Sequence, residues 1–157
     1  MPRTRQSEIQ IRSLAVTYSS GYRIPPHRHA WAQLIYASRG VMSVHTDTGA
    51  WVVPTHRAVW VPCEVEHAIE MSGEVAMRTL YLAPGLAHGV PETCSVVNVS
   101  PLLRELVLHA VELGPLDAAL PEHSRLIGVI LDQLAALPAV PLRVPAPSDP
   151  RAKRAAD

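Results

Sequence analysis

Residues 34–62 read LIYASRGVMSVHTDTGAWVVPTHRAVWVP, and this stretch decides the fold. Short apolar runs rich in β-branched residues alternate here with turn signals, which is typical of β-strands. Ser38–Gly40 predicts a hairpin turn and Thr46–Gly49 predicts another, while Pro54 and Pro62 end the two runs that follow. Many short strands at such close spacing favour a β-sandwich or a β-barrel.

The same pattern extends outward over residues 9–99. Upstream, recurring apolar residues predict a strand over 9–18. Downstream, the runs 65–71 and 75–82 predict two further strands, with Ser72-Gly73 as the turn signal between them. The pattern shows no alternation of strands with helices, so the predicted fold class is mainly β.

The pattern changes at Ser100 to the three- and four-residue spacing of amphipathic helices. Ser100 followed by Pro101 predicts a capped helix over 101–113 that ends at Gly114. A second apolar stripe predicts a helix over 122–137. The two together predict a helical pair after the β-domain.

This helical pair has more apolar residues than packing against one side of a small barrel requires. Leu108, Leu113 and Val129 fall outside the main apolar stripes. Two interpretations remain open at this point: both faces pack on the barrel, or the excess forms a dimer interface.

Residues 139–157 are rich in proline and small residues, which predicts a semi-rigid linker. Residues 149–154, DPRAKR, resemble the capped first turn of a further helix. We therefore expect the linker to lead into a domain that this chain lacks.

Charge and composition exclude several classes of function. The chain has 157 residues, and its 14 Lys+Arg balance its 14 Asp+Glu, so no overall basic field attracts nucleic acid or an anionic membrane. No run approaches the roughly 20 apolar residues of a membrane span, and residues 1–10 do not resemble a secretory signal. We expect a cytoplasmic protein. Reduced thiols are then favoured for Cys63 and Cys94, with a disulfide between them as the alternative.

Histidines form the most distinctive polar pattern. His27, His29 and Gln33 share one parity, so their side chains point to the same side of a regular strand. His67 lies in a later predicted strand and can meet them across a barrel. Three imidazoles and one oxygen donor suit a divalent cation such as Zn²⁺, Ni²⁺ or Fe²⁺. The alternative is that these histidines are ordinary hydrogen-bonded residues of a sheet.

Other residues are weaker candidates for the same pocket. Trp31, Tyr36 and His45 are candidates for lining it and contacting a ligand. The face on which His45 lies depends on a strand register that the sequence does not fix. Trp51 and Trp60 lie among valines, so we expect them in the core.

Two segments resemble the motifs of the cupin superfamily. Residues 27–40 are similar to H-x-H, three or four residues, E, six residues and G, with Gln33 in place of the Glu. Residues 62–67 are similar to P-x-G-x-x-H, with Glu64 in place of the Gly. In cupins these motifs bind a metal, so the resemblance implies four metal ligands here: His27, His29, Gln33 and His67. Gln33 removes the anionic ligand, which leaves a weaker metal site or a metal-free polar pocket as the alternatives.

A wider resemblance covers most of the chain. Residues 26–29, 49–54 and 57–67, with the helix after Ser100, resemble the N-terminal sensor domain of AraC-type transcriptional regulators. The resemblance implies a cupin-like jelly-roll barrel over 1–99 and a helical pair over 100–138 that mediates dimerisation. It further implies that 139–157 is the linker and the start of a C-terminal DNA-binding domain that is missing.

The function that this resemblance implies is sensing of a small-molecule effector, with or without a divalent metal, by a non-enzymatic regulatory domain. It implies a homodimer through the helices 101–113 and 122–137, and DNA binding only through the missing helix-turn-helix units. The competing hypothesis is a free-standing metal-dependent cupin enzyme, a dioxygenase or isomerase, against which Gln33 argues. A third is a regulator fragment that forms mixed dimers with full-length partners.

Overall fold

The computed structural model describes residues 7–137, 139–140 and 144–145, and one long strand organises it. Strand β7 (His67–Leu82) is 16 residues long. Its first half pairs with β2 (Arg23–His27) on one edge, and on the other edge β4 (Ala37–Thr46) pairs with it from Ala68 to Met77. Its second half pairs with β1 (Ile9–Tyr18) and β3 (Ala32–Ile35). All these pairs are antiparallel, and β7 therefore belongs to both layers of the barrel.

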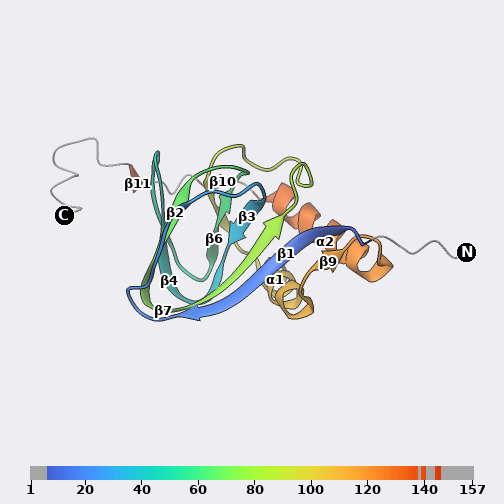
Figure 1. Cartoon of the computed structure of the whole chain (residues 1–157), viewed down its shortest axis with the longest axis horizontal. Helices are drawn as coiled ribbons and strands as arrows, with labels where there is room; N and C mark the ends of the chain where they lie inside the picture. Colours follow the sequence, from blue (N-terminus) through green and yellow to red (C-terminus); the bar gives the residue numbers. More distant parts are fainter. Residues whose placement is uncertain (1–6, 138, 141–143, 146–157) are drawn as a thin grey trace, which may run out of the picture.

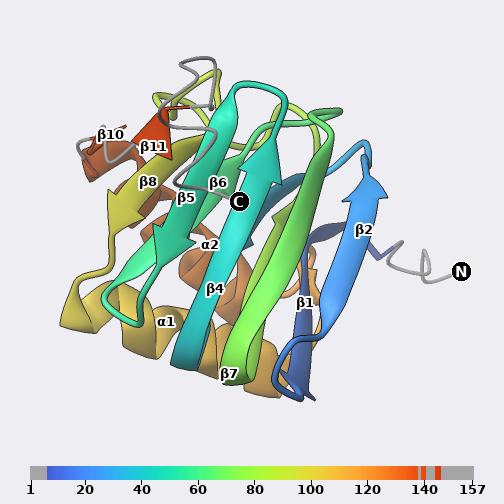
Figure 2. The same ribbon diagram turned by 90° about the vertical axis from the view of Figure 1, so that its left-hand side faces the viewer.

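Shorter strands extend the two layers. β5 (Gly49–Val53) pairs with β4, β6 (Arg57–Val61) pairs with β3, and β8 (Ser95–Asn98) pairs with β6. Figure 2 shows the layer formed by β5, β4, β7 and β2 facing the viewer. The result is a nearly closed antiparallel barrel followed by two helices, which confirms the predicted mainly β fold class.

The hairpin turn predicted at Ser38–Gly40 is wrong. Strands β3 and β4 follow one another along the same edge of β7, and the register shifts on both sides of Arg39. Gly40 has a φ of +89°, and a Cβ there would overlap the backbone oxygen of Glu74. The glycine therefore permits a close approach to β7 at an irregular point of the ladder, and it does not reverse the chain.

The runs 65–71 and 75–82, predicted as separate strands, also need correction. Residues 67–82 form the single strand β7, and Ser72-Gly73 lies inside it. Gly73 has a φ of +72°, which glycine adopts without steric cost. A turn residue in the sequence thus marks an irregularity within one strand.

Side chains alternate between two apolar clusters on opposite faces of the strands. One cluster fills the barrel and includes Ile35, Val44 and Trp51. The other lies between the outer face of the barrel and the helices and includes Leu34 and Trp60. Both tryptophans are 3% exposed, so their expected place in the core is confirmed.

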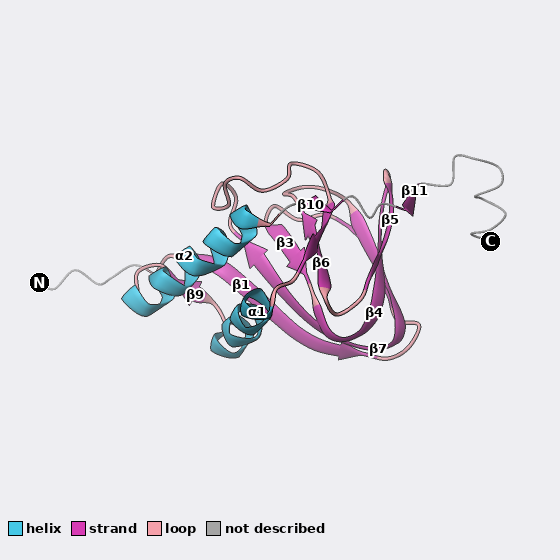
Figure 3. Cartoon of the chain, turned by 180° about the vertical axis from the view of Figure 1, so that it is seen from behind, coloured by secondary structure: helices cyan, strands magenta, loops and turns pink. Residues whose placement is uncertain are grey.

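The helical pair covers one side of the barrel, as Figures 1 and 3 show. It consists of α1 (Pro101–Leu113) and α2 (Pro121–Ala136), with the short strand β9 (Leu116–Asp117) between them on the edge of β1. Ser100 Oγ accepts a hydrogen bond from the Leu103 amide at 3.1 Å, and Gly114 follows α1 with a φ of +78°. These contacts confirm the predicted cap and end of the first helix.

Part of the segment predicted as a linker belongs to the sheet. β10 (Ala139–Val140) pairs with β8, and β11 (Val144–Pro145) pairs with β5, so each lies at one edge of the barrel. The helix start predicted at 149–154 lies outside the described residues.

The two cysteines are free thiols, each partly buried. Burial raises the pKa of Cys94 to about 11, and the nearby Asp47 carboxylate adds to that effect. A thiol with such a pKa is almost entirely protonated at neutral pH.

Replacing Gly40 by alanine is expected to lower the free energy of unfolding by at least about 2 kcal/mol, since the new methyl group meets backbone and the φ stays positive. Gly73→Ala is the matched control. Its φ is also positive, but nothing lies within 4 Å of the added Cβ, so only the backbone cost of about 1 kcal/mol remains. Urea unfolding of both variants measures the difference, and equal losses would contradict the close-approach explanation.

Candidate functional site

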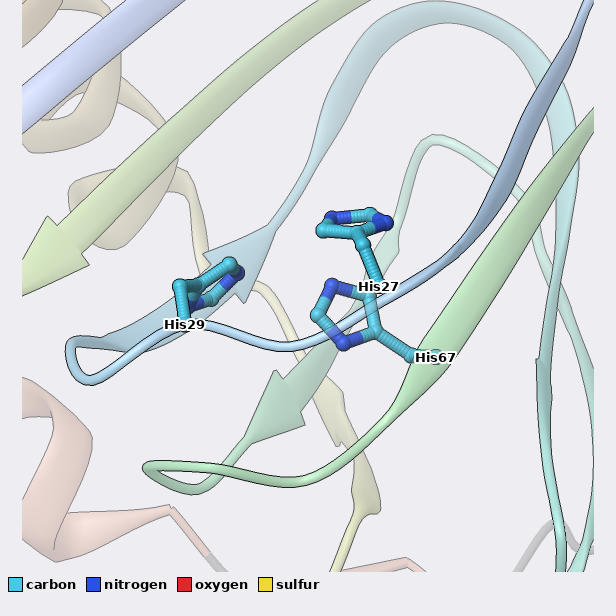
Figure 4. A group of neighbouring side chains, drawn as sticks. All are labelled: His27, His29 and His67. Atoms are coloured by element: carbon cyan, nitrogen blue, oxygen red, sulfur yellow. The ribbon is translucent and has the colours of Figure 1, made fainter.

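Three imidazoles converge at one end of the barrel (Figure 4). His27 is the last residue of β2 and stands opposite His67, the first residue of β7, in the ladder between these strands. His29 lies two residues beyond the end of β2. One potential ligand atom from each ring lies within 4.8 Å of the others. The predicted convergence of these residues is therefore present in the structure.

The two motif segments are tied together by backbone. The Glu64 amide donates a hydrogen bond to the His29 carbonyl at 2.9 Å. Glu64 has a φ of +64°, the left-handed conformation that favours glycine. Glu64 occupies the position at which the cupin motif has its glycine, so the backbone conformation is kept although the residue type has changed.

Backbone carbonyls fix the orientation of each imidazole. The Nδ1 atom lies 2.9 Å from the Pro25 carbonyl oxygen in His27, 2.6 Å from that of Trp31 in His29, and 2.9 Å from that of Val65 in His67. A carbonyl oxygen only accepts hydrogen bonds, so each Nδ1 must carry the proton. In the neutral form, every Nε2 therefore presents a lone pair.

Gln33 from β3 completes the cluster with an oxygen atom. Its Nε2 donates to Thr79 Oγ1 at 2.9 Å, and the Thr79 hydroxyl donates to the Leu34 carbonyl at 2.8 Å. Because the Thr79 proton is used in that second bond, its oxygen must accept from the Gln33 amide nitrogen. This fixes the carboxamide, and Gln33 Oε1 faces His29 Nε2 at 3.0 Å and His67 Nε2 at 3.1 Å.

The resulting arrangement places acceptors against acceptors. Neutral His29 and His67 direct lone pairs at an oxygen that also only accepts, which is repulsive unless a proton or a metal cation lies between them. A proton on Nε2 would convert the ring to an imidazolium. For His67, which is 1% exposed, burial opposes this and lowers its pKa to about 4. The Val65 hydrogen bond acts in the opposite direction, while His27 and His29 lower the pKa further.

The weaker candidates lie in three different places. Trp31 is next to the cluster, because its carbonyl accepts the His29 hydrogen bond and the Arg12 guanidinium lies 5.3 Å from its ring centroid. His45 is on the outer face of β4, where its Nε2 lies 4.0 Å from a Glu70 carboxylate oxygen, and it lines the same cavity as His67. Tyr36 packs in the cluster between the barrel and the helices. Strand parity explains Tyr36, since it is three residues from Gln33 and so faces the opposite way.

Two residues of the site were missed in the sequence. Thr79 is fully buried and holds the Gln33 carboxamide, and the Tyr81 ring meets His29 edge-on at 5.4 Å between centroids. Both belong to β7, and Tyr81 stands opposite Gln33 in the register with β3. A threonine within the apolar run 75–82 was the available signal, but only the register with β3 gives it a partner.

The comparisons with known proteins agree with this architecture. A family model described as the AraC-like ligand binding domain matches residues 14–142. The chain belongs to this family. The expectation of an AraC-type sensor domain with a cupin-like barrel is thereby confirmed.

Among curated proteins, the HTH-type transcriptional regulator NimR of Escherichia coli strain K12 is 35% identical to this AraC-like domain over 127 residues. The match covers 81% of this chain and 46% of NimR, so the chain spans about half the length of this curated relative.

Among solved structures, ToxT from Vibrio cholerae superposes with a TM-score of 0.53 at 4% identity, over 65% of this chain and 47% of that chain. This likeness shows a shared fold. A cupin superfamily protein from Desulfitobacterium hafniense DCB-2 has a TM-score of 0.45 at 17% identity, over 52% of this chain and 83% of that chain. Within the described residues, no helix is both long and apolar enough to span a membrane.

The buried His67 predicts a pH dependence of stability in chelator-treated protein. Its pKa is about 4 in the folded state against 6.5 for the free side chain, so the unfolded chain binds the proton first as the pH falls. The contribution is complete above pH 6.5 and is lost progressively down to about pH 4, by about 3 kcal/mol in total.

Urea unfolding at a series of pH values measures this loss, with His67→Gln expected to flatten the profile between pH 6.5 and 4. The control is His109→Gln, which removes an exposed histidine of α1 and should show the same loss as the wild type. A wild-type profile that His67→Gln does not flatten would show that His67 is not the titrating group.

Proposed function

We propose that this AraC-like domain senses a small-molecule effector for a transcriptional regulator, and that its histidine cluster holds a divalent metal at the sensing site. The observation that carries the proposal is the convergence of lone pairs from His29 Nε2, His67 Nε2 and Gln33 Oε1, with His27 beside them. Ring orientation by backbone carbonyls, as seen here, is the usual support for histidines that bind a metal.

The chemistry of the donors selects the class of metal. Three imidazoles and a carboxamide oxygen are neutral donors that suit Zn²⁺, Ni²⁺ or Fe²⁺, whereas Mg²⁺ and Ca²⁺ prefer carboxylates. The metal would supply a Lewis-acidic, positively charged centre to which an oxygen or nitrogen atom of the effector binds. Without an anionic ligand, the metal is held more weakly than it would be with glutamate in place of Gln33.

The cluster has a route to the outside. His67 borders a cavity of about 230 Å³ whose other walls include Pro26, His45 and the β4–β5 turn at Thr46 and Asp47. A cavity of this size admits a small polar molecule. We infer that the effector, where it contacts the metal, enters from this end of the barrel.

The regulatory step is a shift in population. An effector changes the output only if it binds one arrangement of the protein better than another. Because the regulator NimR is about twice as long as the matched region, we propose that DNA is bound by a segment outside this chain. The balanced charge of this chain agrees with that proposal, because a DNA-binding surface is usually basic. A free-standing metal-dependent enzyme is disfavoured, because Gln33 replaces the anionic ligand.

Metal analysis tests the proposed site directly. Protein purified without chelator is expected to contain about one divalent metal per chain, and His67→Ala or His27→Ala is expected to lose it, because each removes one of few ligands. Gln33→Glu should tighten binding by about tenfold or more, since a carboxylate adds charge, while Gln33→Leu should weaken it.

The matched control for these variants is His109→Ala, which removes an exposed histidine of α1. It should retain the metal of the wild type. A folded wild-type protein that contains no metal and takes up none from Zn²⁺, Ni²⁺ or Fe²⁺ would refute the metal site. Equal loss of metal in His109→Ala would show that metal binding is not specific to the cluster.

We further propose that the helical pair mediates homodimerisation. Each helix buries three residues in the apolar cluster shared by the helices and the strands, and large apolar side chains remain outside that cluster. Leu102 is 53% exposed, Leu113 is 44% exposed and Val129 is 41% exposed. Burying such side chains between two copies gains roughly 1.5–3 kcal/mol each when burial is complete.

Leu113→Glu and Val129→Glu, made separately, are expected to raise the dimer dissociation constant by about 100-fold, because each buries a charge at the proposed interface. Sedimentation velocity over a range of protein concentrations measures the change. The control is Val52→Glu on β5, which is 55% exposed and lies away from the helices. A wild-type chain that stays monomeric, or dimers unaffected by either helix variant, would reject this interface.

A further inference from the structure

Three residues on neighbouring strands form one row beside the histidine cluster. Arg12 of β1 stands opposite Tyr81 of β7, and Tyr81 stands opposite Gln33 of β3. Residues directly opposite each other in antiparallel strands point to the same face of a sheet. Strands in a sheet are spaced by roughly 4.8 Å, so the Cα atoms of Arg12 and Gln33 are about 10 Å apart. The row therefore runs from the cluster, at Gln33, to a basic residue two strands away.

Side-chain contacts join this row to the cluster. The Tyr81 ring meets His29 edge-on, as described above. The Arg12 guanidinium lies over the ring of Trp31, whose carbonyl accepts the hydrogen bond of His29 Nδ1. A guanidinium over an aromatic ring is held there by a cation–π attraction. These contacts place the positive charge of Arg12 beside the His29 end of the cluster.

The charge of Arg12 is not balanced by a carboxylate. Arg12 has no ion-pair partner among the described residues, where the ion pairs are those of Arg23, Arg28, Arg39 and His45. Burial, with a further contribution from Tyr18, raises the pKa of Tyr81, so the phenol in the row stays neutral. The ligands of the proposed metal are neutral too, and a bound cation is often the largest charge in its site. Arg12 and the metal together therefore leave positive charge without an anion.

The acidic residues near the motifs lie on another side of the cluster. Glu66 pairs with Arg28 at 3.4 Å, and both line a cavity of about 440 Å³ that none of the cluster histidines borders. Asp47 and Glu66 also border the cavity beside His67, at the β4–β5 turn. Arg12 belongs to β1 instead. The cluster thus has a negative side at the β4–β5 turn, which attracts a metal cation, and a positive side at β1.

The surface next to Arg12 is apolar and open to solvent. Leu14 stands opposite Thr79 and shares the inward face of Arg12, yet it is 38% exposed. On the same face of β7, Met77 is buried in the barrel core. Arg12 itself is exposed, and Tyr81 is partly buried. A molecule can therefore reach these side chains from solvent without displacing the core.

These features favour one class of ligand. A carboxylate balances the charge of Arg12 and forms two charge-assisted hydrogen bonds with a guanidinium. An apolar body attached to that carboxylate can cover Leu14 and the Tyr81 ring, which is how most small-molecule sites gain affinity. The ligand would also bring to the cluster the negative charge that Gln33 does not supply.

We propose that the effector of this domain is a small organic carboxylate that binds between Arg12 and the histidine cluster, with its carboxylate on the guanidinium and its apolar body on Leu14 and Tyr81. This proposal rests on the proposed sensing role of the cluster and names the class of its effector. Because the effector offsets the metal charge, each should strengthen the binding of the other by the same factor.

Phenylacetate serves as the probe, and phenylacetamide, its neutral analogue, shows what the charge contributes. Each is titrated into the Zn²⁺-loaded, ¹⁵N-labelled chain and followed by the indole N–H signals in ¹H–¹⁵N spectra. Phenylacetate is expected to shift the Trp31 indole saturably and to bind at least tenfold more tightly than phenylacetamide. The Trp60 indole donates to the Pro91 carbonyl and should not shift.

Variants of the row test the assignment of each residue. Arg12→Gln should weaken phenylacetate binding by about tenfold and abolish its advantage over phenylacetamide, whereas Arg12→Lys should lose only about threefold, because it keeps the charge. Leu14→Ala should weaken both probes by about threefold, because it removes apolar contact area. Arg125→Gln, at an exposed position of α2, is the matched control and should bind as the wild type does.

The same titrations in chelator-treated protein separate this proposal from the metal site. Phenylacetate should still bind, about tenfold more weakly and with the same dependence on Arg12. Such binding in a protein that takes up no metal would support the effector class while refuting the metal. Metal uptake with phenylacetate binding that Arg12→Gln does not change would overturn the effector class alone. Equal affinity for phenylacetamide, equal competition by inorganic phosphate, or the absence of a Trp31 shift would also overturn it.

Discussion

The architecture depends on β7, which must hydrogen-bond along both edges while serving two layers. Each half of this strand has different partners, so a slip of one residue would disturb four ladders at once. A close approach occurs within β4, where Gly40 passes the Glu74 carbonyl, and only glycine at residue 40 allows it. The same strand begins with His67 and contains Thr79 and Tyr81. The register that closes the barrel therefore also assembles the histidine cluster.

Most polar groups of the histidine cluster have hydrogen-bond partners, but the lone pairs of Gln33 Oε1 and of the histidine Nε2 atoms face one another without a donor. Each histidine Nδ1 donates its proton to a backbone carbonyl oxygen, and the Gln33 amide nitrogen donates to the Thr79 hydroxyl oxygen. All of this orders lone pairs toward a common space. In a low-dielectric interior the repulsion between them is strong, and a cation relieves it more fully than a proton that burial disfavours on His67. Without a cation, the repulsion between these lone pairs lowers the stability of the folded protein. Sites that serve binding commonly carry such a cost.

The sequence predicted the parts of this structure that depend on local periodicity. Alternating runs and the cap at Ser100 located the barrel and α1. The parity argument for His27, His29 and Gln33 assumed one regular strand, whereas His27 ends β2 and Gln33 lies in β3, and both strands pair with β7. The failures share one physical cause. Gly40 and Gly73 were interpreted as turn residues, because a glycine needed for close approach and one needed for chain reversal look alike until the partner strand is known. Thr79 and the outward face of His45 depend on register in the same way, and register is a long-range property.

Strand β3 connects the two faces of the barrel through contacts that are visible in the structure. Gln33 faces the histidines, whereas Leu34 and Tyr36 pack toward the helices. The Thr79 hydroxyl bridges these sides, because it accepts from the Gln33 side chain and donates to the Leu34 backbone. The Tyr36 carbonyl is in turn held by the Arg78 amide at 2.7 Å. Strand β3 is therefore the element that contacts both the histidine cluster, through Gln33, and the apolar cluster between the barrel and the helices, through Leu34.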